Sequence, residues 1–317
     1  VRREGAGRVI RAAVIALAVG VGLGGCGFGE GDEQDGGASL RVTQDFGREE
    51  LAADEVEAVR EDQTVLRLLQ SHHDVETRFG GKFVEAIDGV EGSGGGGTRD
   101  WFFFVNGVLA DEGAGDWEVE VGDVIQWDNR DWSATQRIPA IVGAYPEPFR
   151  SGTEGERLPV RLECADSDDE ACGDVKDSLT EAGARVSSSQ LAASGGQELI
   201  RVLVGTWDEL RDVRTPATLE EGPEASGVFA RFADEGERLE LLDEDGDVVR
   251  TADAGTGLVA ATALEQQAVV WLVTGLEDVG VQAAAAILDA RSLRNAFAVA
   301  ATPDGPVKLP LSEEDGE

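Results

Sequence analysis

Cysteine and histidine, the side chains that most often act as nucleophiles or metal ligands, are scarce in this chain of 317 residues. The cysteines are Cys26, Cys164 and Cys172, and the histidines are the adjacent His72 and His73. A structural zinc site needs about four such ligands held together, so no metal site is expected. A Ser-His or Cys-His nucleophile would have to recruit a histidine from another domain. The sequence therefore predicts a protein that is not an enzyme.

Cys26 lies at the end of a segment with the features of an export signal. Four arginines precede an uninterrupted small and apolar run at 12–23, which is shorter than the about 20 residues that a membrane span needs. The run ends in Leu23-Gly24-Gly25-Cys26, which resembles a bacterial lipobox, the motif whose cysteine sulfur receives diacylglycerol. We predict a lipoprotein signal peptide at 1–25 and a lipid anchor on Cys26, followed by a flexible tether over 26–38. The expected location is the extracytoplasmic face of the cell membrane; a signal peptide that merely contains a cysteine is the alternative.

Export also bears on the other two cysteines. Cys164 and Cys172 flank the acidic loop 165–171, and in an oxidising compartment they can close a small ring. We expect a disulfide between them, and the alternative is a pair of free buried thiols.

The balance of charge excludes one class of partner. The chain has 27 basic and 63 acidic residues and a net charge of −36. Nucleic-acid-binding proteins concentrate lysine and arginine to replace the counterions of the phosphate backbone, so no nucleic-acid partner is expected. At 41% hydrophobic residues the chain can still build folded cores.

Hydrophobic periodicity divides the rest of the chain into two predicted domains, at 39–145 and 156–310, before an acidic tail at 311–317. In the first we expect a helix at 64–75 among strands at 38–46, 83–90, 101–105, 117–121 and 124–127. In the second we expect helices at 172–182 and 279–290, with strands at 158–164, 200–205, 228–232, 239–249, 269–274 and 297–301. The predicted fold class is α+β, with an N-terminal β-grasp-like domain followed by a separate α/β domain with β-α units.

With these elements placed, residues 40–132 resemble the C-terminal domain of transcobalamin and gastric intrinsic factor, as it recurs in bacterial lipoproteins. The resemblance rests on Thr64-Val65-Leu66, on 83–89, on the aromatic strand 101–105 with Asn106-Gly107, on Gly113 and on 122–127. In that family the domain forms one wall of a cobalamin site. The resemblance implies that cobalamin or a related corrinoid is the ligand, with no other cofactor, and that the binding residues are Trp101, Phe103, Asn106, Gly107, Asp111, Gly113 and Trp127.

The resemblance covers half of such a site, because nothing in the sequence could build the helical barrel that completes it in the vertebrate proteins. Either the ligand is different, or residues 158–310 or a partner complete the wall. The aromatic strand leaves a related alternative open. Trp101 and Phe103 point to one face and Phe102 and Phe104 to the other, so the second face is either a contact patch or is buried under the C-terminal domain.

The predicted function is that of a surface-tethered lipoprotein that binds a small organic ligand, corrinoid or cobalamin-like, for uptake through a membrane vitamin transporter. The alternative is a cell-envelope interaction module that binds wall polymer or a protein partner. The stretch 158–213 weakly resembles peptidoglycan-binding repeat domains of the SPOR type, which favours this alternative.

Three further patterns are set aside. The Gly-x-Gly-x-x-Ala pattern at 255–260 fits a dinucleotide loop, but such short patterns recur in glycine-rich chains. Asp243, Asp245 and Asp247 begin like a calcium loop but lack its later glycine and acid, so a hairpin turn is expected. An imidazole of His72 or His73 could ligate cobalt, although a solvated helix end is the simpler interpretation.

Overall fold

The computed structural model describes residues 33–94, 96–153, 155–191, 199–264 and 268–312. The predicted signal peptide and Cys26 lie outside the described residues, as do most positions of the predicted tether and acidic tail.

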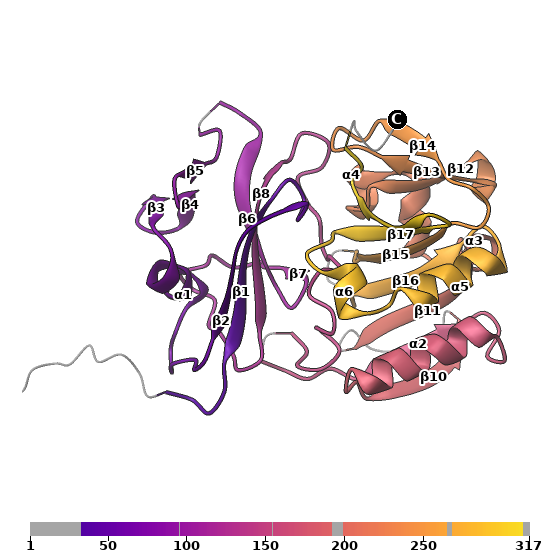
Figure 1. Ribbon diagram of the computed structural model, residues 1–317, viewed down its shortest axis with the longest axis horizontal. Coiled ribbons are helices and arrows are strands. Elements are labelled where there is room, and N and C mark those ends of the chain that lie inside the picture. The colour runs from indigo at the N-terminus through magenta and orange to yellow at the C-terminus, as the bar shows by residue number, and fades with distance from the viewer. Residues whose placement is uncertain (1–32, 95, 154, 192–198, 265–267, 313–317) are drawn as a thin grey trace, which may run out of the picture. The chain divides into compact units, whose positions relative to one another are not determined.

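The first part of the described chain is built on a five-stranded sheet (Figure 1). Its order is β2 (Glu49–Val56), β1 (Ala38–Gln44), β8 (Val124–Asp131), β6 (Arg99–Val105) and β7 (Val108–Leu109). β1 and β8 are parallel, and the other neighbours are antiparallel. Seven consecutive residues of the central β8 are buried, which shows that both faces of the sheet are covered.

Helix α1 (Val65–His72) covers one face of this sheet with its apolar side. Thr64 caps the helix, because its side chain accepts a hydrogen bond from the backbone N–H of Arg67. A small antiparallel sheet follows, formed by β3 (Val75–Arg78), β4 (Phe83–Ile87) and β5 (Val90–Glu91). Val84 and Ile87 of β4 join the core under α1.

The second part is built on a seven-stranded sheet. Its order is β10 (Val186–Gln190), β9 (Val160–Cys164), β11 (Ile200–Thr206), β16 (Val270–Gly275), β15 (Gly257–Thr262), β17 (Ala298–Thr302) and β18 (Gly305–Leu309). The pairs from β10 to β16 are parallel, and those from β16 to β18 are antiparallel.

Two cores lie against this sheet. Helices α2 (Glu170–Glu181) and α5 (Asp278–Ala286) pack beside each other, and their buried residues share one core with the sheet (Figure 1). The other core includes the small sheet of β12 (Ala230–Ala233), β13 (Arg238–Leu242) and β14 (Val248–Thr251). The remaining helices are short: α3 (Trp207–Leu210), α4 (Pro223–Ser226), α6 (Ala290–Leu293) and the 3-10 turns Pro216–Glu220 and Asp234–Gly236.

The second of these cores also joins the two parts of the chain. Phe46 packs edge-on against Phe229 with ring centres 4.9 Å apart, and Phe104 packs against Phe297 at 5.4 Å. By their contacts, residues 31–317 form one compact unit. The predicted bounds of 39–145 and 156–310 stay predictions within it.

The predicted fold class is wrong. The described chain is mostly β-sheet, with eighteen strands in four sheets and few helices, rather than an α+β chain with β-α units. Several missed strands have no apolar alternation: β2 has the sequence EELAADEV, and the edge strand β10 has the sequence VSSSQ. An edge strand is held by backbone hydrogen bonds to one neighbour, so side-chain periodicity does not reveal it. Conversely, the strand predicted at 117–121 is a loop in which Glu118 alone forms an isolated bridge to Thr64.

In the part of the chain that the structure describes, no helix is both long and apolar enough to cross a membrane.

Candidate functional site

The loop between β7 and β8 is anchored to the start of helix α1. The backbone oxygens of Ala114 and Trp117 accept hydrogen bonds from the N–H groups of Leu66 and Val65, at 2.7 and 2.9 Å. These donors belong to the first turn of the helix, where no intrahelical partner exists. Residues 110–118, which we call the binding loop, are therefore held in a defined place.

One side of the binding loop faces a hollow of about 270 Å³, which we call the junction hollow. Both parts of the chain supply its apolar lining: Val105, Val108, Leu109, Trp117 and Pro139 from the first, and Leu158, Leu199, Ile200, Ala263, Leu264, Ala268 and Val269 from the second. Its charged residues are Asp111 and Arg137, and Thr153 adds a hydroxyl. Such a lining can hold an apolar group and orient it with few polar contacts.

Arg137 links the two walls of the junction hollow. Its guanidinium donates a hydrogen bond of 3.5 Å to the backbone oxygen of Ala263, while the neighbouring Ile138 and Pro139 are buried. Asp111 and Arg137 are both exposed, so the hollow brings one charge of each sign within reach of a ligand without burying either.

A second hollow along the binding loop, of about 320 Å³, is strongly acidic. It is lined by Trp117 and five carboxylates: Asp111, Glu112, Asp116, Glu118 and Glu120. Among the described residues, however, no group of three or more His, Cys, Asp or Glu side chains could hold a metal ion.

The aromatic residues predicted to bind the ligand lie in the core beneath α1. Trp101, Phe103 and Trp127 are 6%, 9% and 2% exposed. Phe103 stacks on Trp127 with ring centres 4.9 Å apart, and the indole N–H of Trp101 donates to the backbone oxygen of Val90 at 3.1 Å. The structure thus places these three side chains where they stabilise the sheet.

Asn106 and Gly107 form the turn between β6 and β7, and both have positive φ angles. The side chain of Asn106 accepts from the N–H of Val124 and donates to Asp123 and to the backbone oxygen of Gly152, at 2.8–3.0 Å. Burial raises the pKa of Asp123 although its carboxylate accepts hydrogen bonds from Asn106 and from the N–H of Glu120. A Cβ at Gly107 would lie 2.7 Å from the backbone oxygen of Ile141, so glycine is required there. These contacts give both Asn106 and Gly107 a structural role in the turn.

Asp111 and Gly113 are the predicted residues that line hollows. Asp111 lines both hollows described above, and Gly113 lines a third on the α1 side of the loop. The sequence-based prediction missed Trp117, which it assigned to a strand, and Arg137, which lies in a stretch without periodicity. No local pattern distinguishes either residue, because the hollow exists only where distant segments meet.

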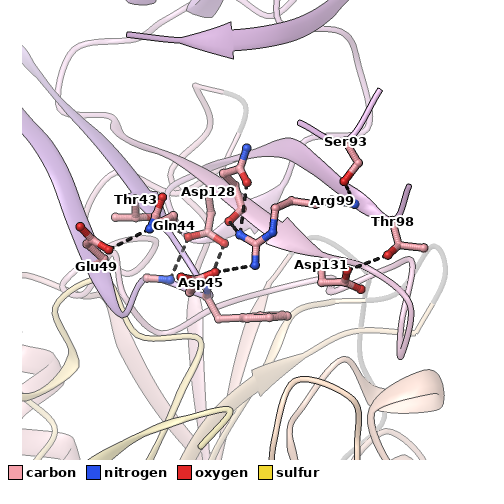
Figure 2. A network of polar contacts seen from close by, with 12 residues as sticks. Thr43, Gln44, Asp45, Glu49, Ser93, Thr98, Arg99, Asp128 and Asp131 are labelled. Atoms are coloured by element: carbon pink, nitrogen blue, oxygen red, sulfur yellow. Dashed lines mark hydrogen bonds and ion pairs between the residues drawn. The ribbon is translucent and has the colours of Figure 1, made fainter. Parts of the chain in front are cut away.

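On the second face of the aromatic strand, Phe102 is half-buried and Phe104 is packed against the second part of the chain. Phe104 is fully buried in the shared core. A polar network lies at the ends of β1 and β8 (Figure 2). Asp128 in this network accepts hydrogen bonds from Thr43, Phe46 and Gly47 at 2.6–3.1 Å, yet complete burial raises its pKa. Of the two alternatives for this face, the structure shows burial.

The side chains of both histidines contact other residues of the first part of the chain. The two ring nitrogens of His73 lie 2.7 Å from a carboxylate oxygen of Asp88 and 3.0 Å from one of Asp54. Nδ1 of His72 contacts Ser71 and the backbone oxygen of Leu68. His73 therefore has no free nitrogen for a cobalt ion in this structure.

The remaining predicted features are local. Cys164 and Cys172 form a disulfide, with Cα atoms 6.0 Å apart.

Residues 257–262 are strand β15, and a Cβ at Gly257 would lie 2.0 Å from the backbone oxygen of Gly280. This position therefore needs a glycine for close packing. Asp243 accepts from the N–H groups of Asp245 and Asp247 within the β13–β14 turn, as a hairpin requires.

Comparison with known families assigns one segment of the chain. Residues 62–131 match the family described as a domain of unknown function (DUF4430). This segment contains α1, β3 to β8 and the binding loop. No curated protein matches the chain.

Among solved structures, the chain is similar to one described as "a putative metal binding protein from Ruminococcus gnavus ATCC 29149". The identity is 16%, the TM-score is 0.25, and the alignment covers 30% of this chain and 97% of the other.

Proposed function

We propose that this chain is a binding protein that holds a small organic ligand in the junction hollow. The observation that carries the proposal is the lining of the hollow, in which apolar side chains from both parts of the chain meet beside Asp111 and Arg137. Organic ligands are most often held in concave apolar sites where a few polar groups fix their orientation. The resemblance of residues 40–132 to a cobalamin-binding domain supports ligand binding by the same part of the chain.

The first ligand class that we propose is a corrinoid. The volume of about 270 Å³ lies below the roughly 300–1,000 Å³ of pockets that enclose a drug-sized ligand. A corrin ring is larger than such a ligand, so the hollow would receive one edge of the ring or one of its amide side chains. The second wall, which the vertebrate proteins build from a helical barrel, would here come from residues 158–269.

The place and the role of this binding protein are also proposals. Residues 1–26 resemble the signal segment of an exported lipoprotein, so we propose the extracytoplasmic face of the membrane as the location of the chain. There it would pass its ligand to a membrane transporter. We propose binding without catalysis, because neither His72 nor His73 is among the residues that line the junction hollow.

Calorimetric titration of the full chain in detergent with cobalamin and cobinamide tests the proposal. We expect Trp117→Ala and Arg137→Ala each to weaken binding at least about tenfold, which corresponds to about 1.4 kcal/mol. Trp132→Ala is the matched control, because the Trp132 indole donates to Asp100 and does not line the hollow.

Two outcomes would overturn the proposal. Absence of binding at high micromolar concentration would exclude corrinoids. Equal losses in Trp117→Ala and Trp132→Ala would show that the junction hollow is not where the ligand binds.

A further inference from the structure

We propose that the chain has a second ligand site, which binds a small aromatic anion between helix α1, the β3–β4 turn and the binding loop. A hollow of about 310 Å³ lies there, and we call it the hairpin hollow. Among the residues that line it are Leu66, Arg67, Gln70, Gly81, Lys82 and Asp116. The junction hollow shares none of these residues, so the two sites can be tested independently.

The residue that first indicates a ligand is Phe79, at the tip of the β3–β4 hairpin. Its side chain is 82% exposed, which is the largest exposure among the large hydrophobic residues that the structure describes. Its backbone has a φ angle of 54°, a conformation that is strained for an aromatic residue. Exposure of the ring and a positive φ angle both oppose folding, and a glycine would make the same turn without either cost. Such a combination is typical of residues that are kept for contact with another molecule.

The wall beside Phe79 is bare backbone. Gly80 and Gly81 continue the turn with φ angles of 75° and 90°. A Cβ at Gly80 would meet no atom within 4 Å, and one at Gly81 would meet Leu66 at 3.5 Å, an ordinary contact. Neighbouring atoms therefore do not exclude side chains here. The absence of side chains leaves a flat surface that a planar ligand can approach closely.

The charge of the hairpin hollow differs from that of the rest of the chain. Arg67 and Lys82 line it, although the chain as a whole carries a net charge of −36. Lys82 is exposed and forms none of the ion pairs found among the described residues. The guanidinium of Arg67 donates 3.4 Å to the backbone oxygen of Asp62, so its charge is not paired there. These two cations favour an anionic ligand, which Asp116 opposes.

The lining and the residue next to it together specify a chemical class. Leu66, Arg67 and Lys82 line the hollow: Leu66 is apolar, and the two cations can bind a carboxylate or sulfonate. Phe79 does not line the hollow but directly precedes Gly80, which does, and its exposed ring offers a face for stacking. A planar aromatic acid satisfies all of these groups, whereas a neutral aromatic leaves the two cations unused.

Titration of the full chain with 2-naphthoate and with neutral 2-naphthamide, followed by chemical shifts or calorimetry, tests the site. We expect naphthoate to bind more tightly than naphthamide. Arg67→Gln and Lys82→Gln should each weaken naphthoate binding about threefold to fivefold, in line with exposed ion pairs, and leave naphthamide unchanged. Asp116→Asn should strengthen naphthoate binding by a similar factor. Lys176→Gln, on an exposed face of α2, is the control for net charge.

Phe79→Gly separates a binding role from a structural role. Glycine relieves the positive φ angle, so we expect an unchanged or higher melting temperature together with weaker binding of both compounds. Val279→Ala, at another exposed apolar residue, should change neither. The proposal is overturned if naphthoate does not bind, if it binds no more tightly than naphthamide, or if Asp116→Asn and Lys82→Gln shift its affinity in the same direction. A lower melting temperature of Phe79→Gly would also overturn it, because Phe79 would then serve the fold.

Discussion

The guanidinium of Arg130 lies 3.8 Å from the ring centre of Phe102, inside the protein. Arg130 is fully buried, and none of its three side-chain nitrogens has a hydrogen-bond partner among the described residues. The rings of Phe104 and Phe297 lie 5.6 and 5.7 Å from the same cation. Burial lowers the pKa of Arg130 to about 10, and the nearby charge of Asp128 opposes this shift. The cation is therefore held by aromatic faces from both parts of the chain and by one buried carboxylate.

We expect Arg130→Met to destabilise the chain, and to do so more strongly as the pH rises. Burial already raises the pKa of Asp128 above its usual 3.8, so the native state favours the protonated acid, and stability is lost as the pH rises through the folded-state pKa. Without Arg130 the ionised carboxylate loses its opposite charge. The decrease in the free energy of unfolding, measured by urea denaturation, should reach about 3–5 kcal/mol at pH 8 and be smaller at pH 5.

Arg294→Met is the control for this prediction. Arg294 pairs with Glu50 at 2.7 Å, and both side chains are substantially exposed, so its loss should cost at most about 1 kcal/mol. Equal destabilisation of Arg130→Met at both pH values would show that Asp128 does not depend on Arg130.

The elements that could be predicted from the sequence are those with a buried face. β1, α1, β6, β8, β11 and β16 lie within a few residues of their expected positions, because their apolar spacing reflects the core directly. The predicted fold class was wrong because strands such as β2 and β10 were missed, and these strands are polar or lie at sheet edges. Their positions follow from backbone pairing with a neighbour, which no periodicity records.

The candidate site could be predicted only in part. The alternation of side chains along a strand correctly assigns Phe103 and Phe104 of β6 to opposite faces. It does not predict which face is covered, and in this structure each of the two residues lies in a core. Asp111 and Gly113, which line hollows, are predicted from the resemblance of residues 40–132 to the transcobalamin domain and not from any spacing in the sequence. Trp117, Arg137 and Val269 meet through tertiary folding alone, so their common hollow has no local signal.

We expect Asp88→Asn to lower the melting temperature at neutral pH. Burial alone would raise the pKa of Asp88, but hydrogen bonds from the N–H of Asp74 and from His73 outweigh it and lower the pKa below 3.8. A carboxylate with a lowered pKa stabilises the fold above its unfolded-state pKa, and this contribution is lost as the pH falls through the folded-state value. The difference from wild type should therefore shrink below about pH 3.8 in thermal melts.

Glu61→Gln, which removes an exposed acid, should leave the melting temperature unchanged at both pH values. If Asp88→Asn melts like wild type at pH 7, the bridge from His73 to Asp88 does not contribute to stability.

We expect Cys26→Ser to abolish membrane anchoring by lipid. A hydroxyl cannot form the thioether to diacylglycerol, so the variant should keep its signal segment and migrate as the larger precursor. Wild type should be released from membranes by detergent and not by high salt, because two acyl chains give stable attachment. The double variant Cys164→Ala/Cys172→Ala should be lipidated normally. Release of wild type by salt would contradict the lipid anchor.

Removal of the disulfide should cost roughly 2–3 kcal/mol of unfolding free energy, since the bond joins cysteines that are eight positions apart. Cys164→Ala/Cys172→Ala is the suitable variant, because both positions are buried and alanine adds no polar group to the core. Urea denaturation of wild type should move toward the variant when a reductant is added, whereas the variant itself should not respond. In native wild type, neither thiol should react with an alkylating agent until reductant is present. Ready labelling without reductant, together with a denaturation curve that reductant does not change, would show that the two thiols are free.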